Sequence, residues 1–293
     1  MTVHKSIEDL NILMLGVARN CEKTLKHDVL RLRDAFSFAR SIHHYVVESD
    51  SNDGTVGVLD ELAAELIGFE YVTHSKLREK IVQRTARLAY CRNDYVRYAR
   101  LLSFKMPIDY IVVADLDGIN SQISRSAVES CWNRDDWGAC FANQKGPYYD
   151  IWALRHPLWS PNDCWEQERF YRQFLVGKAL RAYISVYSRQ LRIPENSEWI
   201  EVDSAYGGFG LYRADVFLSP GEHVGLDSLG KEICDIPPFH KDIKRPGVKF
   251  FINPKLINGA VNEHTRRLSF PRVIKLVCRI ASNIIHQSLS CNK

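Results

Sequence analysis

The sequence has 293 residues, of which 45% are hydrophobic and 25% charged, as in an ordinary folded protein. Its formal net charge is +4, but the six basic residues that follow residue 264 have no acidic counterpart, so the part before them is slightly acidic. This balance excludes a general nucleic-acid-binding role and assigns the basic excess to the tail.

The cysteines and the N-terminus indicate the compartment. No two cysteines form a Cys-x-x-Cys pair, and the eight are scattered: Cys21, Cys91, Cys131, Cys140, Cys164, Cys234, Cys278 and Cys291. This pattern is typical of free buried thiols in a reducing environment. The N-terminal stretch MTVHKSIEDL lacks the apolar core of a signal peptide, and no stretch is long enough to span a membrane. We therefore expect a cytoplasmic protein.

The first half of the chain alternates between two hydrophobic patterns. Apolar runs that lead into polar turns predict strands within residues 11–20, 43–55, 69–74 and 110–115. Helical spacing of apolar residues predicts helices within residues 23–40, 58–67 and 81–102. This order predicts an α/β fold with a doubly wound, mostly parallel sheet flanked by helices. Ligands bind such sheets at the carboxyl ends of the strands.

The second half is less regular. It contains, in order, a strand, an aromatic loop, a long helical stretch, a glycine-containing segment and a last apolar segment, at residues 137–143, 146–159, 164–191, 199–217 and 249–259. The clearest linker lies near Pro271. We predict one domain over residues 1–265 and a basic tail over residues 266–293.

Polar residues follow the predicted strands and should meet around one crevice. They are Arg19, Glu48, Asp50, Asp53, Asp115 and Asp117. Alternate residues of a strand share a face, so Asp115 and Asp117 would point the same way. Leaving two carboxylates side by side is costly unless a cation offsets their repulsion, and Mg²⁺ or Mn²⁺ suits such hard oxygen ligands. The alternative is a pair of turn or capping aspartates.

Three arginines of the predicted helix 81–102 add a phosphate-binding character. They are Arg84, Arg87 and Arg92, and the first two are three residues apart and therefore share a helix side. Guanidinium groups pair well with phosphate oxygens. The alternative is an ordinary solvated helix face.

These blocks together resemble a known enzyme family. The segments GVARN, VVESDSNDGT, RLAYCRN, VVADLDG, YGGFGLYR and FINPKLINGAVNEHT occur in the order found in nucleotide-sugar glycosyltransferases of the GT-A fold. The likeness covers roughly residues 11–265. It is nearest to bacterial polysaccharide glycosyltransferases of capsule or O-antigen synthesis and, more loosely, to fungal capsule α-1,3-mannosyltransferases. It is specific for fold and reaction class, not for the sugar.

The resemblance implies a donor site that contains a divalent cation, Mn²⁺ or Mg²⁺. Asp115 and Asp117 would bind the metal, with His264 as a third ligand, and Asp115 would also contact the sugar or ribose. The nucleotide sugar would be bound by Ala18, Arg19, Glu48, Asp50, Arg84, Arg87, Arg92, Gly207 and Gly208. Asp50 and Asp53 have turn capping as an alternative, which we favour for Asp53.

The resemblance also implies an acceptor site and a catalytic carboxylate. Acceptor contacts would come from Tyr149, Asp150, Trp152, Arg155 and His240. An inverting enzyme needs a general base near the acceptor hydroxyl, and Asp235 is the first choice with Asp203 second. The Pro237–Pro238 pair departs from the expected helix-compatible residues and puts the geometry around Asp235 in question. A retaining mechanism needs no dedicated protein base, so the stereochemistry stays open.

The expected function is metal-dependent transfer of a hexose to a glycan or lipid-linked glycan acceptor in cell-surface polysaccharide or lipopolysaccharide synthesis. A UDP-sugar donor is favoured, with GDP-mannose as an alternative. The competing functions are a sugar-nucleotide nucleotidyltransferase and a non-catalytic nucleotide-sugar-binding subunit. In the tail, residues 270–289 form a basic amphipathic pattern suited to an anionic membrane surface at the inner face of the cytoplasmic membrane. Packing against the domain is the alternative.

Overall fold

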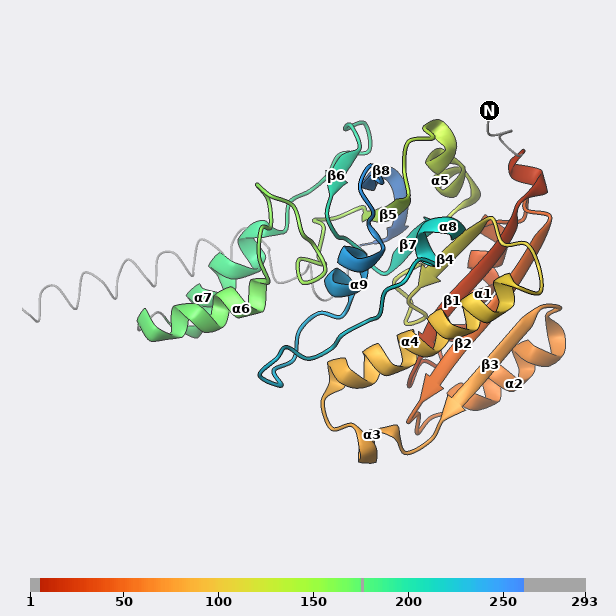
Figure 1. Ribbon diagram of the computed structural model, residues 1–293, viewed down its shortest axis with the longest axis horizontal. Coiled ribbons are helices and arrows are strands. Elements are labelled where there is room, and N and C mark those ends of the chain that lie inside the picture. The colour runs from red at the N-terminus through yellow and green to blue at the C-terminus, as the bar shows by residue number, and fades with distance from the viewer. Residues whose placement is uncertain (1–5, 175–176, 261–293) are drawn as a thin grey trace, which may run out of the picture.

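A single mixed sheet forms the centre of the protein. The computed structural model describes residues 6–174 and 177–260. Within them, an eight-stranded sheet has the order β3-β2-β1-β4-β7-β5-β8-β6 (Figure 1). The strands are β1 (Asn11–Ala18), β2 (Ser41–Ser49), β3 (Phe69–His74), β4 (Tyr110–Ala114), β5 (Ala139–Gln144), β6 (Ile200–Val202), β7 (Phe209–Arg213) and β8 (Phe250–Gly259).

The strand directions confirm the predicted mostly parallel sheet. β1 pairs in parallel with both β2 and β4, and β2 with β3. β7 is antiparallel to both β4 and β5, which makes β5 run in the same direction as β4. β8 is parallel to β5, and the short β6 at the edge is antiparallel to β8. The carboxyl ends of β1, β2, β4, β5 and β8 therefore meet at one edge of the sheet.

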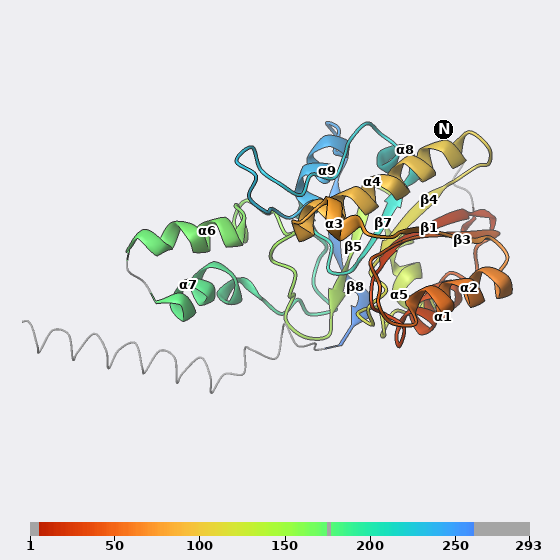
Figure 2. The same cartoon turned by 90° about the horizontal axis from the view of Figure 1, so that it is seen from below.

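Helices cover both faces of this sheet. The α-helices are α1 (Leu25–Ala35), α2 (Thr55–Glu65), α3 (Leu77–Lys80), α4 (Arg84–Ser103), α5 (Arg125–Glu129), α6 (Cys164–Phe170), α7 (Lys178–Ser185), α8 (Ala214–Phe217) and α9 (Ile236–Ile243). Short 3₁₀ turns are η1 (Ile7–Asp9), η2 (Ser130–Asn133), η3 (Tyr171–Phe174) and η4 (Tyr187–Arg189). Figure 2 shows α4 and α9 on one side of the sheet and α1, α2 and α5 on the other.

The apolar runs of the central strands follow from this layering. In β1, Leu13 and Leu15 belong to the core cluster under α4, whereas Ile12 and Met14 belong to the cluster under α1 and α2. Successive side chains of a strand point to opposite faces, and a strand buried on both faces must be apolar throughout. The predicted α/β fold with helices on both sides is confirmed.

The structure divides one predicted helical stretch into several short helices. The helical stretch predicted over residues 164–191 is divided into α6, η3, α7 and η4, and the pair α6 and α7 projects from the body of the molecule (Figures 1 and 2).

Pro237 and Pro238 lie in the first turn of α9. Proline is tolerated there because the first backbone N–H groups of a helix have no partner within it. The proline pair is therefore compatible with a helix that begins directly after Asp235.

Two of the predictions concern residues outside the described ranges. These are the basic amphipathic stretch at residues 266–293 and the predicted metal ligand His264. In the described part of the chain, no helix combines the length and the apolar character needed to cross a membrane.

Candidate active site

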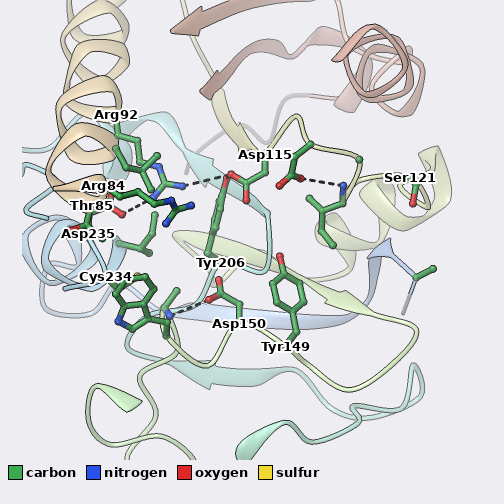
Figure 3. Close-up of a pocket in the computed structure, with 18 residues that line it drawn as sticks. Arg84, Thr85, Arg92, Asp115, Ser121, Tyr149, Asp150, Tyr206, Cys234 and Asp235 are labelled. Carbon is green, nitrogen blue, oxygen red and sulfur yellow. Dashed lines mark hydrogen bonds and ion pairs between the residues drawn. The ribbon is translucent and has the colours of Figure 1, made fainter. Parts of the chain in front are cut away.

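Two adjoining cavities lie at the carboxyl ends of β1, β2 and β4. We call the larger one, of about 570 Å³, the aspartate cavity, and the smaller one, of about 220 Å³, the side cavity. Five residues line both cavities: Arg84, Leu88, Arg92, Asp115 and Asp117. The two cavities therefore form one crevice, at the sheet edge where ligands of doubly wound proteins bind. Figure 3 shows the aspartate cavity.

Asp115 is the first residue after β4 and lies between a positive and a negative neighbour. Its backbone N–H donates to the Gly208 carbonyl at 3.0 Å, which fixes its position, and its carboxylate accepts from the Tyr206 hydroxyl at 3.0 Å. A guanidinium nitrogen of Arg92 lies 3.6 Å from the same carboxylate. Burial and the nearby Asp117 raise the pKa of Asp115 to about 7, although Arg92 and the Tyr206 hydrogen bond act in the opposite direction. Its negative charge is thus only partly compensated.

Asp117 is exposed at the mouth of the crevice. Its carboxylate accepts a long hydrogen bond of 3.4 Å from the Ile119 N–H. Among the described residues, no three His, Cys, Asp or Glu side chains are grouped as a complete metal site. Mg²⁺ and Mn²⁺ are often held by one or two carboxylates together with waters and substrate phosphates. Asp115 and Asp117 therefore fit a divalent cation that depends on the substrate for further ligands.

Arg92 is the centre of a buried charge network beneath Asp115. One of its terminal nitrogens donates to both carboxylate oxygens of Asp235, at 2.8 and 3.0 Å, and the His223 ring lies 3.0 Å from that carboxylate. The Asp235 side chain is only 2% exposed. Burial raises the pKa of Asp235, but Arg92 and His223 outweigh it and hold that pKa well below its usual range. Asp235 is therefore a charged partner of Arg92, although it does form part of the cavity wall.

The other two arginines of α4 have different surroundings. Arg84 lines both cavities, and Figure 3 shows its guanidinium directed from α4 into the aspartate cavity. Arg87 lines the side cavity but is 8% exposed. It donates to the carbonyls of Ile81 and Val82 at 2.8 and 2.6 Å, and so anchors the segment before α4. Arg84 is the better placed of the two to contact a phosphate.

Residues at the ends of β1 and β2 line the side cavity. Ala18 and Arg19 line it, as the resemblance implies, together with Ser49. Glu48 does not belong to the lining of either cavity. It is 1% exposed and accepts from the Ser51 N–H at 2.8 Å, so its carboxylate stabilises the turn after β2.

Asp50 and Asp53 act as caps in the structure. Both Asp50 carboxylate oxygens accept from the Arg78 N–H, at 3.2 and 3.0 Å, in the first turn of α3. Asp53 accepts from the Thr55 N–H at 3.0 Å and from its hydroxyl at 2.6 Å, at the start of α2. The capping role favoured for Asp53 is confirmed, whereas Asp50 caps α3, 28 residues further along the chain, and not the turn that follows it.

The glycine pair Gly207–Gly208 lies behind the crevice and contacts two of its aspartates. Their φ angles are +68° and +84°, a conformation that side chains rarely adopt. Gly208 holds the backbone of Asp115, and Gly207 donates to the Asp150 carboxylate at 3.0 Å. Neither glycine belongs to the lining of the two cavities. Their close contacts are with protein, and they position the two carboxylates of the site.

Replacing Gly208 by alanine should introduce a steric clash in the site in addition to the conformational cost of a positive φ. A positive φ costs an alanine roughly 1–2 kcal/mol. A Cβ there would also lie 2.7 Å from the Ile119 side chain, so the loop that follows Asp117 must shift. Gly230 is the matched control, because its φ is +73° and a Cβ would meet nothing within 4 Å. We expect Gly230→Ala to show only the conformational cost in urea unfolding, and Gly208→Ala to lose more stability and also to weaken the binding of any nucleotide and divalent cation in the crevice. Equal nucleotide binding by the two variants would contradict a positioning role.

Asp150 faces the same cavity from the aromatic loop. Its two carboxylate oxygens accept from the N–H groups of Gly207 at 3.0 Å and Ala153 at 3.2 Å. Burial raises the pKa of Asp150, and these hydrogen bonds only partly offset it. Figure 3 shows the carboxylate next to Tyr206, on the side of the cavity opposite α4. Asp150 is therefore held in place while it remains in the cavity wall.

The rest of the aromatic loop is divided between cavity and scaffold. Tyr149 and Trp152 line the aspartate cavity, as predicted for an acceptor surface. The Trp152 ring nitrogen donates to Asp163 at 2.9 Å. Arg155 lies outside the lining and donates to the Trp152 carbonyl at 2.8 Å and to Asp163 at 3.3 Å. Arg155 thus stabilises the loop and does not reach the cavity.

The structure does not bring two other predicted residues to the cavity. Asp203 is 67% exposed and pairs with Lys244 at 2.8 Å, outside the lining of both cavities. His240 is fully buried, and its ring lies 2.9 Å from the Ser204 hydroxyl and 2.8 Å from the Tyr212 hydroxyl. Burial lowers the pKa of His240 well below its usual range. Its position on the inner side of α9 makes it a core residue, which sequence spacing alone did not show.

Sequence reasoning missed several members of the site. Tyr206, Thr85, Ser121 and Cys234 line the aspartate cavity, and His223 lies behind it. Tyr206 opens the YGGFG block, so its place beside the glycines was an available signal. His223 had no such signal, because its partner Asp235 is known only from the fold.

Comparisons with known proteins agree at the level of the fold. No family model matches the sequence, and no curated protein matches it. Among solved structures, the chain is similar to glycosyltransferases and related sugar-transferring synthases. TarS 1–349 from S. aureus in complex with UDP-GlcNAc has a TM-score of 0.47 at 10% identity, over 89% of this chain and 62% of that one. The mannosyltransferase PcManGT from Pyrobaculum calidifontis, in complex with GDP-Man and Mn²⁺, has a TM-score of 0.44 at 12% identity, over 85% and 56%.

This chain matches a larger share of a third similar structure. Mannosyl-3-phosphoglycerate synthase from Rubrobacter xylanophilus has a TM-score of 0.43 at 14% identity, over 95% of this chain and 75% of that one. The chain spans between 48% and 62% of the TarS and PcManGT structures that it matches first.

Proposed function

We propose that this protein is a glycosyltransferase that moves a hexose from a nucleotide sugar to a glycan acceptor, with a divalent cation, Mn²⁺ or Mg²⁺. A UDP-sugar is the favoured donor and GDP-mannose the alternative. The acceptor is a glycan of cell-surface polysaccharide or lipopolysaccharide synthesis. The observation that carries the proposal is the pair Asp115 and Asp117 at the carboxyl end of β4, inside a crevice that Arg84 and Arg92 also line.

Transfer from a nucleotide sugar needs positive charge near the phosphates of that donor. Asp115 and Asp117 would hold the cation, and when bound it would stabilise the charge that develops on the departing diphosphate. Arg84 extends into the same cavity and is placed to pair with a phosphate oxygen. Arg92 stays below, where its pairing with Asp235 directs its second terminal nitrogen toward Asp115. The nucleoside then fits the side cavity formed by Ala18 and Arg19.

The acceptor half needs a proton acceptor near the acceptor hydroxyl if the reaction inverts configuration. Asp235, first choice from the sequence, is charge-paired on both sides, and its lowered pKa makes it a weak base. Asp150 lies in the cavity wall beside Tyr149 and Trp152, and its raised pKa suits proton transfer better. We therefore assign the base to Asp150 and a positioning role to Asp235.

Asparagine variants of the two residues separate these roles. Asp150→Asn should lower turnover by at least about a hundredfold, the scale of lost acid–base help, with little change in donor affinity. Asparagine can accept only one of the two backbone N–H bonds, so the melting temperature must be measured in parallel. Asp235→Asn should instead lower both the melting temperature and turnover. A stable Asp235→Asn with a hundredfold slower rate, beside a fully active Asp150→Asn, would return the role to Asp235.

A screen of donors tests the function itself. UDP-, GDP- and CMP-sugars are added with and without Mn²⁺, and the melting temperature is recorded. A ligand that binds only the folded state at a hundred times its dissociation constant stabilises it by about 2.7 kcal/mol. We expect one nucleotide class to raise the melting temperature in the presence of Mn²⁺ and much less in its absence. If no nucleotide sugar stabilises the protein in either condition, the proposed function is wrong.

A further inference from the structure

A third cavity opens at the same edge of the sheet, beyond β5 and β8. It has a volume of about 540 Å³, and a neighbouring hollow of about 390 Å³ shares Lys145, Glu195 and Asn196 with it. We call the two together the distal cavity. β5 ends at Gln144 and β8 at Gly259, with α5 packed beside β8 (Figure 1). Because β4, β5 and β8 run in the same direction, the residues at the ends of β5 and β8 lie at the same edge of the sheet as the aspartate cavity.

Only one layer of chain separates the distal cavity from the aspartate cavity. Ser121 lines the aspartate cavity, and the next residue, Gln122, lines the distal one. The Gln122 N–H donates to the Asn258 carbonyl at 2.8 Å, and Ala260, two residues further on, lines the aspartate cavity again. The two cavities therefore lie close together, on opposite sides of the chain segments at residues 121–122 and 257–260.

The distal cavity is positively charged. Lys145, Lys255 and Arg192 line it with exposed side chains, and Glu195 is the one acidic residue among the described residues of its lining. Among the described residues, none of the three cations forms an ion pair of the kind that Lys26 and Lys244 form elsewhere. Like charges gathered in a cleft focus its electric field and raise the local concentration of oppositely charged ligands.

A buried chain of amide side chains connects the wall of the distal cavity to the site. Gln144 lines the distal cavity and is 1% exposed, and its side-chain nitrogen donates to Asn258 at 3.2 Å. Asn258 donates to Asn120 at 3.0 Å, and Asn120 donates to the Asp115 carbonyl at 2.7 Å. The side-chain oxygen of Gln144 has no hydrogen-bond partner among the described residues. This network fixes the separation of the two cavities, and it leaves one polar atom of the wall unsatisfied.

We propose that the distal cavity binds an anionic group, a phosphate or a carboxylate, of an acceptor glycan that extends out of the aspartate cavity. Lys and Arg side chains form charge-assisted hydrogen bonds with both groups. That the bound molecule is an acceptor substrate rests on the proposed function, whereas the binding of an anion in the distal cavity does not. The proposal makes the enzyme selective for a charged polymer longer than a single sugar.

Binding of labelled oligomers, measured by fluorescence anisotropy without divalent cations, tests the proposal. The probes are a polyphosphate and an oligogalacturonate of similar length, with a neutral dextran oligosaccharide as the uncharged reference. The variant Lys145→Gln/Lys255→Gln removes two charges from the cavity and keeps the length of both side chains. The matched control is Lys105→Gln/Lys241→Gln, which removes two charges from exposed lysines outside the cavity.

We expect the cavity variant to bind one anionic probe at least tenfold more weakly, and the control variant less than twofold more weakly. Lys145→Arg/Lys255→Arg should retain binding. The tighter of the two anionic probes in the wild-type protein identifies phosphate or carboxylate as the preferred group. Equal weakening in cavity and control variants, or no binding of either anionic probe by the wild-type protein, would overturn the proposal.

The donor screen on the same proteins keeps this proposal separate from the proposed function. Both double variants should show the wild-type shift of melting temperature with nucleotide sugar and Mn²⁺. A wild-type protein that binds the anionic probe but no nucleotide sugar would refute the transferase function and leave the anion site standing. The converse result would refute the anion site alone.

Discussion

Replacing Asp117 by alanine should reduce sugar transfer by about a thousandfold or more, with the fold intact. Asp117 is exposed and makes one long hydrogen bond, so its removal costs little packing. Its carboxylate is one of the two that would hold the cation, whose electrostatic help is worth several kcal/mol, and each 1.4 kcal/mol changes the rate about tenfold. The measurement is steady-state turnover with the donor found in the thermal screen, together with the Mn²⁺-dependent shift in melting temperature, which should vanish.

Asp203→Ala is the matched control for this experiment. Asp203 is also an exposed aspartate, it follows β6, and it pairs with Lys244 outside both cavities. Its loss should change turnover less than about twofold, since exposed ion pairs contribute about 0–1 kcal/mol. Full activity of Asp117→Ala, or of the wild-type protein in excess chelator, would contradict the metal site. A large loss in Asp203→Ala would contradict the location of the active site.

Arg92→Met should lower the free energy of unfolding by about 3–5 kcal/mol. The substitution leaves the carboxylate of Asp235 buried with only His223 as a neighbour, and an uncompensated buried charge is strongly destabilising. The free energy is measured by urea unfolding, where the midpoint should fall without a large change in slope. Replacement of both partners, Arg92→Met with Asp235→Leu, should recover part of the loss because no buried charge is then left alone.

Arg97→Met provides the comparison on the same helix. Arg97 is 57% exposed and lies 3.8 Å from Asp94, so its loss should change the free energy of unfolding by less than about 1 kcal/mol. If Arg92→Met proves no more destabilising than Arg97→Met, the expected cost of leaving Asp235 buried without its partner is contradicted.

The parts of the fold that were predictable are those encoded locally. The apolar runs of β1 and β4 and the two aspartates after β4 are contiguous in sequence, and the alternation of strands and helices then fixes the sheet edge where Asp115 and Asp117 lie. Arg84 was predictable for the same reason, because helical spacing decides which side of α4 it occupies.

The remainder depends on partners that are far apart in the chain. Arg92 and Asp235 are 143 residues apart, and no local pattern shows that this pairing turns a plausible base into a structural ion. His240 was placed in the acceptor site by the resemblance, since it is close to Asp235 in the sequence, yet the fold puts it on the buried side of α9. Glu48 was misplaced for a similar reason, since the side of a strand end on which a carboxylate lies depends on the turn that follows.

The position of β7 in the sheet has a consequence for how the chain folds during synthesis. β7 lies between β4 and β5, although it is made about 70 residues after β5 begins. Until residues 209–213 leave the ribosome, the apolar β4 has an unpaired edge and β5 has no neighbour that joins it to the first half of the sheet. An unpaired apolar edge is a site of aggregation. The nascent chain is therefore most in need of chaperone protection between the synthesis of β4 and that of β7.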